Sequence, residues 1–255
     1  MANKELSIWM NQEEIIEIRE KHKGKIPKKI LYGFVHEALI SIVQGGDEFR
    51  DYIVRDTTSR RYMNSLEILG IDEIEEYNIR EGALVYFTRH HNFDIAAEIA
   101  AILNKSRLAK ECSERWAKKQ DNLEEKADWF IKAAGYAARL EDLNDANRLF
   151  DLAVDCYLEA EKSLTPQQPW REKSFLVMAA WWSYPRRKRK LEDSFRFKGA
   201  LKNSPYGPEP RASLPEEPLI PIENLERAIE LYEQIGGNKS TLDELREEKE
   251  KLTVK

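Results

Sequence analysis

The residues best suited to chemistry stand in the segment TRHHNFDIAAE, residues 88–98. The imidazoles of His90 and His91 come first, and the carboxylates of Asp94 and Glu98 follow. If this segment is helical, His91, Asp94 and Glu98 share one face at positions i, i+3 and i+7, where their nitrogen and oxygen atoms suit a divalent metal ion. No distant ligand of similar strength accompanies them, and the polar start of a helix has the same composition. We therefore expect no metal and no cofactor.

A run of five cations in the segment YPRRKRKLED forms the second candidate. Its members are Arg186, Arg187, Lys188, Arg189 and Lys190. The run reverses the negative sign of the chain locally and directly follows Trp181, Trp182 and Tyr184. This combination suits nucleic-acid phosphates with stacked bases, or else an anionic partner or lipid surface. The alternative is a solvated helical turn after Pro185, with the tryptophans buried in the core.

The composition limits the classes of protein to which the chain can belong. Its 255 residues are 42% apolar and 10% aromatic, enough for a sizeable core in one or two domains. A formal net charge of −5 excludes a chain whose whole surface coats nucleic acid. No apolar run approaches the roughly 20 residues of a membrane span, and no secretory signal is visible. We expect a cytoplasmic protein, and its many Glu, Lys, Arg and Ile are typical of thermophiles.

Two further observations bear on enzymatic activity. Cys112 and Cys156 are far apart in the sequence and form no ligand pair, so we expect reduced thiols in or near the core, with a disulfide as the alternative. The sequence contains no glycine-rich phosphate loop, nucleophile elbow, cysteine pair or paired-carboxylate motif. These absences favour a protein that is not an enzyme.

The chain that positions these candidates has apolar residues at helical spacing almost throughout. The exception is the segment 199–223, whose six prolines predict an extended or irregular loop. Residues 82–89 fit either a short strand or a buried helical turn. The predicted helices cover residues 11–22, 27–45, 47–54, 59–69, 94–103, 106–119, 123–140 and 144–164, and a closing pair follows the loop. In that pair Gly236–Gly237 predicts a left-handed helix end, and Thr241 with Glu244 predicts a capping box.

Small residues lie where the helices 123–140 and 144–164 are expected to meet. The stripe of the first helix consists of Leu123, Ala127, Phe130, Ala134, Ala137 and Leu140, and that of the second consists of Ala146, Phe150, Ala153, Tyr157 and Ala160. Alanines at such a contact let two helix axes approach to near the short end of the usual range of about 8–10 Å. Gly135 costs about 1 kcal/mol relative to alanine in a helix interior, so we expect a close backbone approach there.

These stripes resemble the tetratricopeptide repeat, a hairpin of two helices. Ala146, Phe150 and Ala153 fall on the small, aromatic and small positions of its second helix, and Phe130 falls on the aromatic position of its first. The resemblance implies that such hairpins stack on one another as an array.

The match has departures that point to a longer, divergent form of the hairpin. The usual glycine and tyrosine positions hold Ala134 and Ala137, and Leu158 replaces the terminal proline. The segments AGYAARLEDL and AIELYEQIGG are similar to the longer hairpins of soluble NSF attachment proteins. Together the resemblances cover about residues 94–162 and 223–252.

The predicted fold is therefore all-α, with antiparallel helical hairpins stacked as a tetratricopeptide-like array. An N-terminal helical region of unknown role covers residues 1–92. The tetratricopeptide-like repeat region covers residues 93–255 and is interrupted by the proline-rich loop 199–223. Another all-helical bundle is the alternative architecture.

The resemblance also implies a binding surface, because the first helices of tetratricopeptide arrays line a groove that holds partner peptides. It places Trp129, Lys132, Tyr136 and Arg139 in that groove as partner-binding residues. The alternative is that Trp129 and Tyr136 pack against an adjacent repeat. We predict a non-enzymatic adaptor or scaffold that binds a peptide or subunit of another protein.

Two other functions compete with the adaptor. A nucleic-acid-binding protein would use the basic and aromatic segment 181–190. A helical RNase-like enzyme would use residues 89–98, because Arg89 beside His90 and His91 resembles the minimal signal of the HEPN domains. The spacing of arginine and histidine departs from the usual gap of that family.

Overall fold

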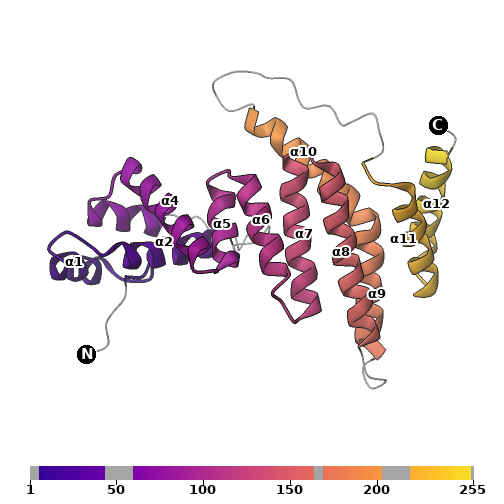
Figure 1. Cartoon of the computed structure of the whole chain (residues 1–255), viewed down its shortest axis with the longest axis horizontal. Helices are drawn as coiled ribbons and strands as arrows, with labels where there is room; N and C mark the ends of the chain where they lie inside the picture. Colours follow the sequence, from indigo (N-terminus) through magenta and orange to yellow (C-terminus); the bar gives the residue numbers. More distant parts are fainter. Residues whose placement is uncertain (1–5, 44–59, 164–168, 203–218, 254–255) are drawn as a thin grey trace. The chain divides into compact units, whose positions relative to one another are not determined.

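The computed structural model describes residues 6–43, 60–163, 169–202 and 219–253 (Figure 1). The described residues form helices packed against one another and contain no strand, which confirms the predicted all-α fold. The chain divides into two compact units, Met1–Lys105 and Ser106–Lys255. Residues 93–105, which we predicted to be part of the repeat region, belong to the first unit.

Two helices of the N-terminal unit begin at polar caps. The side chain of Asn11 accepts a hydrogen bond from the backbone of Glu14 and completes a capping box at the start of α1. Asp72 caps α4 in the same way through the backbone N–H of Glu75. The helices are α1 (Gln12–Lys21), α2 (Lys28–Val43), a helix over residues 60–69, α4 (Glu73–Arg89) and α5 (Phe93–Ile102).

The ambiguous segment 82–89 is the second half of α4 and not a strand. Ile79, Ala83, Leu84 and Phe87 are buried at helical spacing, so the core contacts of this segment have a period of about 3.6 residues. α4 packs against α2 and α5, and Phe34 of α2 and Tyr62 of helix 60–69 pack against one another nearby. The predicted helix over residues 47–54 lies outside the described residues.

The C-terminal unit contains seven described helices. Their bounds are α6 (Ser106–Ala117), α7 (Leu123–Arg139), α8 (Leu143–Lys162), α9 (Pro169–Ser183), α10 (Pro185–Lys202), α11 (Ile222–Gln234) and α12 (Lys239–Thr253). Three residues join α7 to α8, so these helices run side by side in opposite directions (Figure 1). The predicted hairpin over residues 123–164 is confirmed in type and nearly in its bounds.

The alanines of this hairpin are in the core, as predicted. Ala134, Ala146 and Ala153 have no exposed surface, and α7 and α8 make the most extensive helix contact in the unit. The reason predicted for Gly135 needs correction. The close neighbour of a Cβ built at Gly135 is the side-chain Cε of Lys190, at 3.2 Å, and not a backbone. Gly135 therefore makes room for a side chain of α10.

The order of contacts shows how the unit is assembled. α6 packs on α7, α7 on α8 and α8 on α9, in the order of a linear series. α10 then contacts both α9 and α7, so the four helices α7 to α10 close into a ring. α11 adds to α9, and α12 packs on α11 (Figure 1). α7 is consequently flanked by α6, α8 and α10.

Two local predictions in the last third of the chain are wrong. α10 continues to Lys202, so the first residues of the predicted loop 199–223 are helical. The last helix begins at Lys239, and its cap is Asn238, whose side chain accepts a hydrogen bond from the Ser240 backbone. Thr241 therefore lies inside the helix and cannot cap it. The left-handed end at Gly236 is confirmed, with φ of 66°.

Candidate functional site

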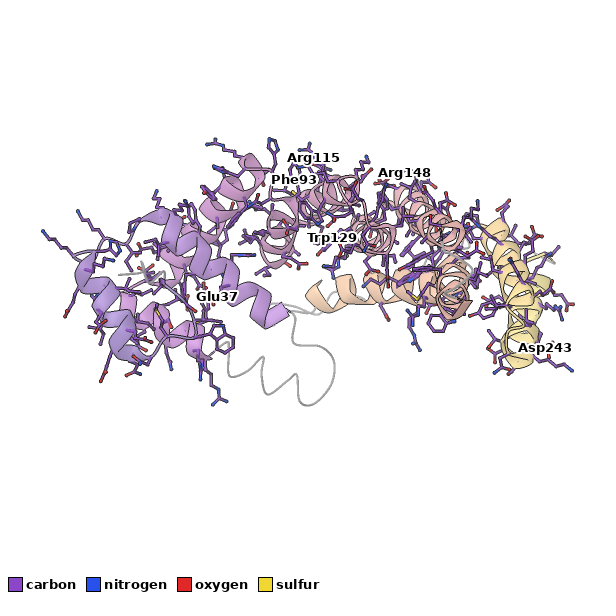
Figure 2. The ribbon with its side chains drawn as sticks, turned by 90° about the horizontal axis from the view of Figure 1, so that it is seen from below. Glu37, Phe93, Arg115, Trp129, Arg148 and Asp243 are labelled. Carbon is purple, nitrogen blue, oxygen red and sulfur yellow. The ribbon has the colours of Figure 1, made fainter. Side chains whose placement is uncertain are left out.

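The predicted partner-binding residues lie together on one side of α7. Trp129, Lys132, Tyr136 and Arg139 are spaced by three, four and three residues, which brings them to one face of a helix. We call these four residues the α7 face, and Figure 2 labels Trp129 on it. Lys132 is exposed, and the other three are half-buried.

The α7 face is organised as two stacked pairs of a cation and an aromatic ring. Lys132 Nζ lies 4.0 Å from the centroid of the Trp129 ring, and Arg139 Cζ lies 5.3 Å from that of Tyr136. Each contact places a charge over a π-system, which favours this arrangement of the two side chains at the helix surface. The face therefore offers apolar ring area beside positive charge. Such a surface suits a partner with apolar anchors and carboxylates.

Neighbouring helices hold α7 in place from several sides. The Tyr157 hydroxyl of α8 donates a hydrogen bond of 3.1 Å to the Asp128 carboxylate of α7, directly before Trp129. Burial raises the pKa of Tyr157, and the charge of Asp128 raises it further, so the phenol stays protonated. The buried alanines of α7 lie on the remainder of its circumference. The face is thus mounted on a helix with little freedom to move.

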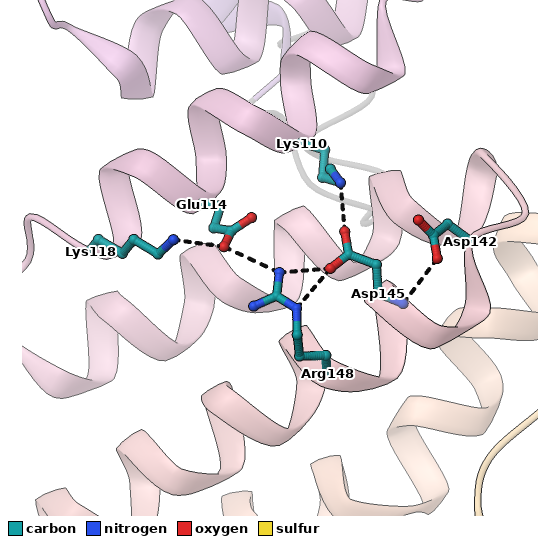
Figure 3. Close-up of polar contacts among 6 residues, drawn as sticks. All are labelled: Lys110, Glu114, Lys118, Asp142, Asp145 and Arg148. Atoms are coloured by element: carbon teal, nitrogen blue, oxygen red, sulfur yellow. Dashed lines mark hydrogen bonds and ion pairs between the residues drawn. The ribbon is translucent and has the colours of Figure 1, made fainter.

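An ion network joins α6 directly to α8 (Figure 3). Arg148 of α8 lies 2.7 Å from Asp145 and 3.2 Å from Glu114 of α6. Lys110 of α6 reaches Asp145 at 2.5 Å, and Lys118 reaches Glu114 at 2.8 Å. The two helices that flank α7 are therefore tied to each other by their side chains.

The electrostatics of this network favour its charged form. Burial by itself would raise the pKa of Asp145, but hydrogen bonds and charges from Lys110 and Arg148 outweigh it and lower that pKa. The pKa of Glu114 is likewise lowered, because Lys118 and Arg148 outweigh the effect of burial. Both carboxylates stay ionised at neutral pH, and the network remains intact there.

The basic run does not form one continuous surface. Arg187 is fully buried: its guanidinium donates to the Asp151 carboxylate at 2.5 Å and to the Asn147 carbonyl at 3.2 Å. Burial lowers the pKa of Arg187, and Asp151 opposes that effect. The same carboxylate of Asp151 accepts from Asn224, so this arginine helps to connect α8, α10 and α11. Arg187 is therefore removed from the predicted anion-contacting surface.

The other four cations of the run differ in their surroundings. Lys188 pairs with Glu248 of α12, and Arg186 lies over the Trp181 ring, with its Cζ 4.0 Å from the centroid. Arg189 and Lys190 are exposed, although Lys190 also lies against Gly135 of α7. Arg186 and Arg189 are consequently the members of the run with the clearest access to solvent.

The histidines predicted for an RNase-like or metal site lie in the turn between α4 and α5. His90 is the C-cap of α4, where its Nδ1 lies 2.8 Å from the Tyr86 carbonyl and its ring stacks on Tyr86. His91 has a φ of 61° and precedes α5, so it is not in one helix with Asp94 and Glu98. The metal site proposed for His91, Asp94 and Glu98 required all three in one helix, and that requirement is not met. In the described residues, no group of three His, Cys, Asp or Glu side chains is arranged to hold a metal.

Two observations concern the remaining expectations about the chain. Cys112 and Cys156 are buried thiols and are not joined in a disulfide, as predicted, and burial raises the pKa of Cys156. Within the parts of the chain that the structure describes, every helix is too short or too polar to cross a bilayer.

One surface of the N-terminal unit was not predicted from the sequence: two hollows that share Tyr32 lie between α2 and α4. The signal in the sequence was Gly82, a glycine in the interior of α4, where alanine would be more favourable.

Comparison of the whole chain with family models, curated proteins and solved structures gave no match in any of the three.

Proposed function

We propose that the protein is a non-enzymatic adaptor that binds a segment of a partner protein on the α7 face. The observation that supports this most strongly is the pairing of cations with half-buried aromatic rings at Trp129, Lys132, Tyr136 and Arg139. Ring area and positive charge at one rigid site are the usual components of a binding hot spot.

The rigidity of the site supports the same proposal. α7 is braced by α6, α8 and α10, and the flanking helices α6 and α8 are linked by the network around Arg148. A pre-formed surface loses little conformational entropy when it binds, so a few anchors suffice for affinity. The four side chains occupy about three helical turns of α7, enough for a short peptide or one helix of a partner.

The proposed mode of binding is tetratricopeptide-like in its use of the first helix of a hairpin. It differs from binding in a tetratricopeptide array in one respect, because α10 folds back and contacts α7. We therefore place the partner on the outer side of α7, beside α10, and not in a groove that continues along many repeats. The charge of Lys132 and Arg139 favours an acidic partner segment.

The test compares three baits: the unaltered chain, a variant of the α7 face and a control variant of α12. The full chain and the double variant Lys132→Glu with Arg139→Glu are immobilised and exposed to extract of the native host. The matched control reverses Arg246 and Lys251 of α12, which changes the net charge equally. We expect a defined protein that the unaltered chain and the control retain and the α7 variant loses. Equal retention by all three baits refutes the assignment of this face.

The nucleic-acid alternative receives less support from the geometry. Arg187 is buried and Lys188 is paired with Glu248, which leaves a short basic surface around Arg186 and Arg189. An RNA-binding site would be sensitive to Arg186→Glu with Arg189→Glu in a labelled-RNA shift at low salt. A shift that these reversals abolish would replace the adaptor proposal.

A further inference from the structure

The N-terminal unit has two hollows along the same side of α4. The first has a volume of about 440 Å³ and lies between the start of α2 and the first half of α4. Its apolar lining includes Ile26, Leu31, Leu69, Ile71 and Ile79. The second has a volume of about 420 Å³ and lies beside the second half of α4. Each falls within the size range of common ligand pockets.

Tyr32 lines both hollows, so they are adjacent along α4, and we refer to the two together as the groove. The α4 residues that line them are Glu75, Asn78, Ile79, Glu81, Gly82, Val85, Tyr86 and Arg89. They follow one another at helical spacing, so the lining continues along one side of the helix. From Glu75 to Arg89 the groove extends for about 21 Å at 1.5 Å per residue. This length fits a peptide segment better than a compact small molecule.

Gly82 determines the shape of the groove where the two hollows meet. A Cβ built at Gly82 would lie 2.9 Å from Cζ of the Tyr32 ring and closer still to its hydroxyl oxygen. Tyr32 therefore lies across α4 at a position that only glycine leaves open. Glycine is unfavourable in the middle of a helix relative to alanine, so its presence here needs a reason. The seating of Tyr32 supplies that reason.

The second hollow has an aromatic wall. The rings of Tyr32 and Tyr86 have centroids 5.6 Å apart, and those of Tyr86 and His90 have centroids 4.1 Å apart. Val85 beside them is 47% exposed. An aromatic or aliphatic side chain of a ligand would find ring faces and an exposed valine here.

Positive charge surrounds both ends of the groove. Lys25 and Lys28 line the first hollow, and the guanidinium of Arg19 lies 3.5 Å from the Cβ position of Gly70 in its wall. Arg89 lines the second hollow.

The groove is lined by fewer carboxylates than cations. Glu81 is neutralised by Lys105, whose Nζ lies 2.7 Å from it, and its pKa is lowered by that contact and by Tyr77. Glu75 is the other acidic residue in the lining. The lining therefore carries more positive than negative charge, which complements an acidic ligand.

We propose that this groove binds an acidic segment of a partner protein, with apolar side chains in the two hollows and carboxylates near Lys25, Lys28 and Arg89. The site is separate from the α7 face and belongs to the other unit of the chain. It gives the protein a second binding surface, with a preference set by charge at both ends of the groove.

The test uses a display library of random 16-residue peptides selected on the full chain. We expect recovered peptides to be net negative, to carry at least one aromatic or aliphatic anchor, and to bind at least tenfold more weakly to a triple variant, Lys25→Glu, Lys28→Glu and Arg89→Glu. The matched control reverses Arg246, Lys249 and Lys251 of α12 and keeps the affinity. A second variant, Gly82→Ala, displaces Tyr32 without loss of helix propensity. We expect it to keep or raise the melting temperature and to weaken the same peptides at least tenfold.

Several results would overturn the proposal. One is the recovery of no peptide that prefers the unaltered chain to the triple variant. Another is the recovery of peptides without acidic residues, or of peptides whose affinity is unchanged in the triple variant or in Gly82→Ala. A labelled 20-nucleotide RNA that binds the unaltered chain and loses affinity in the triple variant would assign the groove to nucleic acid instead.

Discussion

The two units of the protein differ in how many large apolar side chains they leave exposed. In the C-terminal unit the alanines of α7 and α8 are buried, and Phe150 stacks on Trp182. In the N-terminal unit the large apolar side chains of Ile74, Tyr77 and Val85 are exposed along α4. Small residues in the core let helices pack closely and leave little apolar area outside. Exposed apolar residues beside hollows mark a surface that a partner can cover.

The charged residues of the two units differ in a related way. In the C-terminal unit they tie helices together, as Arg148 does for α6 and α8 and Arg187 does for α8 and α10. In the N-terminal unit Lys25, Lys28 and Arg89 line hollows. The comparison indicates that charge mainly organises packing in one unit and is available for recognition in the other.

Of the changes described below, we expect Phe150→Ala to cause the largest loss of stability. Phe150→Ala removes a fully buried ring that stacks on Trp182, at a centroid distance of 5.6 Å, and supports Arg187. We expect a loss of about 4 kcal/mol in the free energy of unfolding, measured by urea titration with tryptophan fluorescence. The matched change Ile74→Ala, at a 75% exposed position, is expected to cost less than about 0.5 kcal/mol. Similar losses in both variants would contradict the contrast between the units.

An intermediate effect is expected from filling the close contact between α7 and α8. Ala153→Leu adds three carbons at a position without exposed surface, so neighbouring helices must move apart. The expected cost is about 1–3 kcal/mol in the free energy of unfolding. Val85→Leu enlarges an exposed apolar residue of α4 and is expected to change stability by less than about 0.5 kcal/mol. Tolerance of leucine at 153 would show that the alanines do not set the helix separation.

We expect a smaller effect on the stability of the protein in acid, from the network around Arg148. Asp145 and Glu114 have lowered pKa values in the folded chain, so they bind fewer protons than in the unfolded chain. Their contribution is present above the unfolded pKa of about 4 and is lost as the pH falls through the folded value. Asp145→Asn is expected to destabilise the protein by about 1 kcal/mol at pH 7 and to reduce the loss of stability between pH 5 and pH 2.5. Chemical denaturation at a series of pH values measures both the loss of stability at pH 7 and the change between pH 5 and pH 2.5.

A control isolates the effect of the network. Glu247→Gln removes a carboxylate that is 70% exposed and lies 3.9 Å from Lys251. It is expected to leave the pH dependence of stability unchanged. If Asp145→Asn shows the same acid sensitivity as the unaltered chain, the network does not contribute as described.

The sequence predicted features that depend on local periodicity. The two stripes that contain Ala134 and Ala153 and the helical class of the chain follow from spacing, and the helix end at Gly236 follows from the glycine pair. The sequence could not show that α10 returns to α7, because that contact depends on the tertiary course of the chain. The burial of Arg187 within a basic run was hidden for the same reason, since its partner Asp151 is 36 residues away.

The two candidate surfaces differ in how far they could be predicted. The α7 face consists of residues on one helix, so spacing was enough to group Trp129 with Lys132. The groove combines Lys25 and Tyr32 with residues of α4 about 50 residues later in the chain, which no local pattern connects. Gly82 was the one local sign of it, because a glycine inside a helix needs a neighbour that requires the space.

The most direct test of the adaptor function is site-specific photo-crosslinking on the α7 face. A photoreactive phenylalanine is placed at position 132 in cells of the native host, with position 251 of α12 as the control. We predict one discrete crosslinked species at position 132, which is absent at position 251 and lost when Arg139→Glu is added. Crosslinks that are the same at both positions, or that persist with Arg139→Glu, would contradict it.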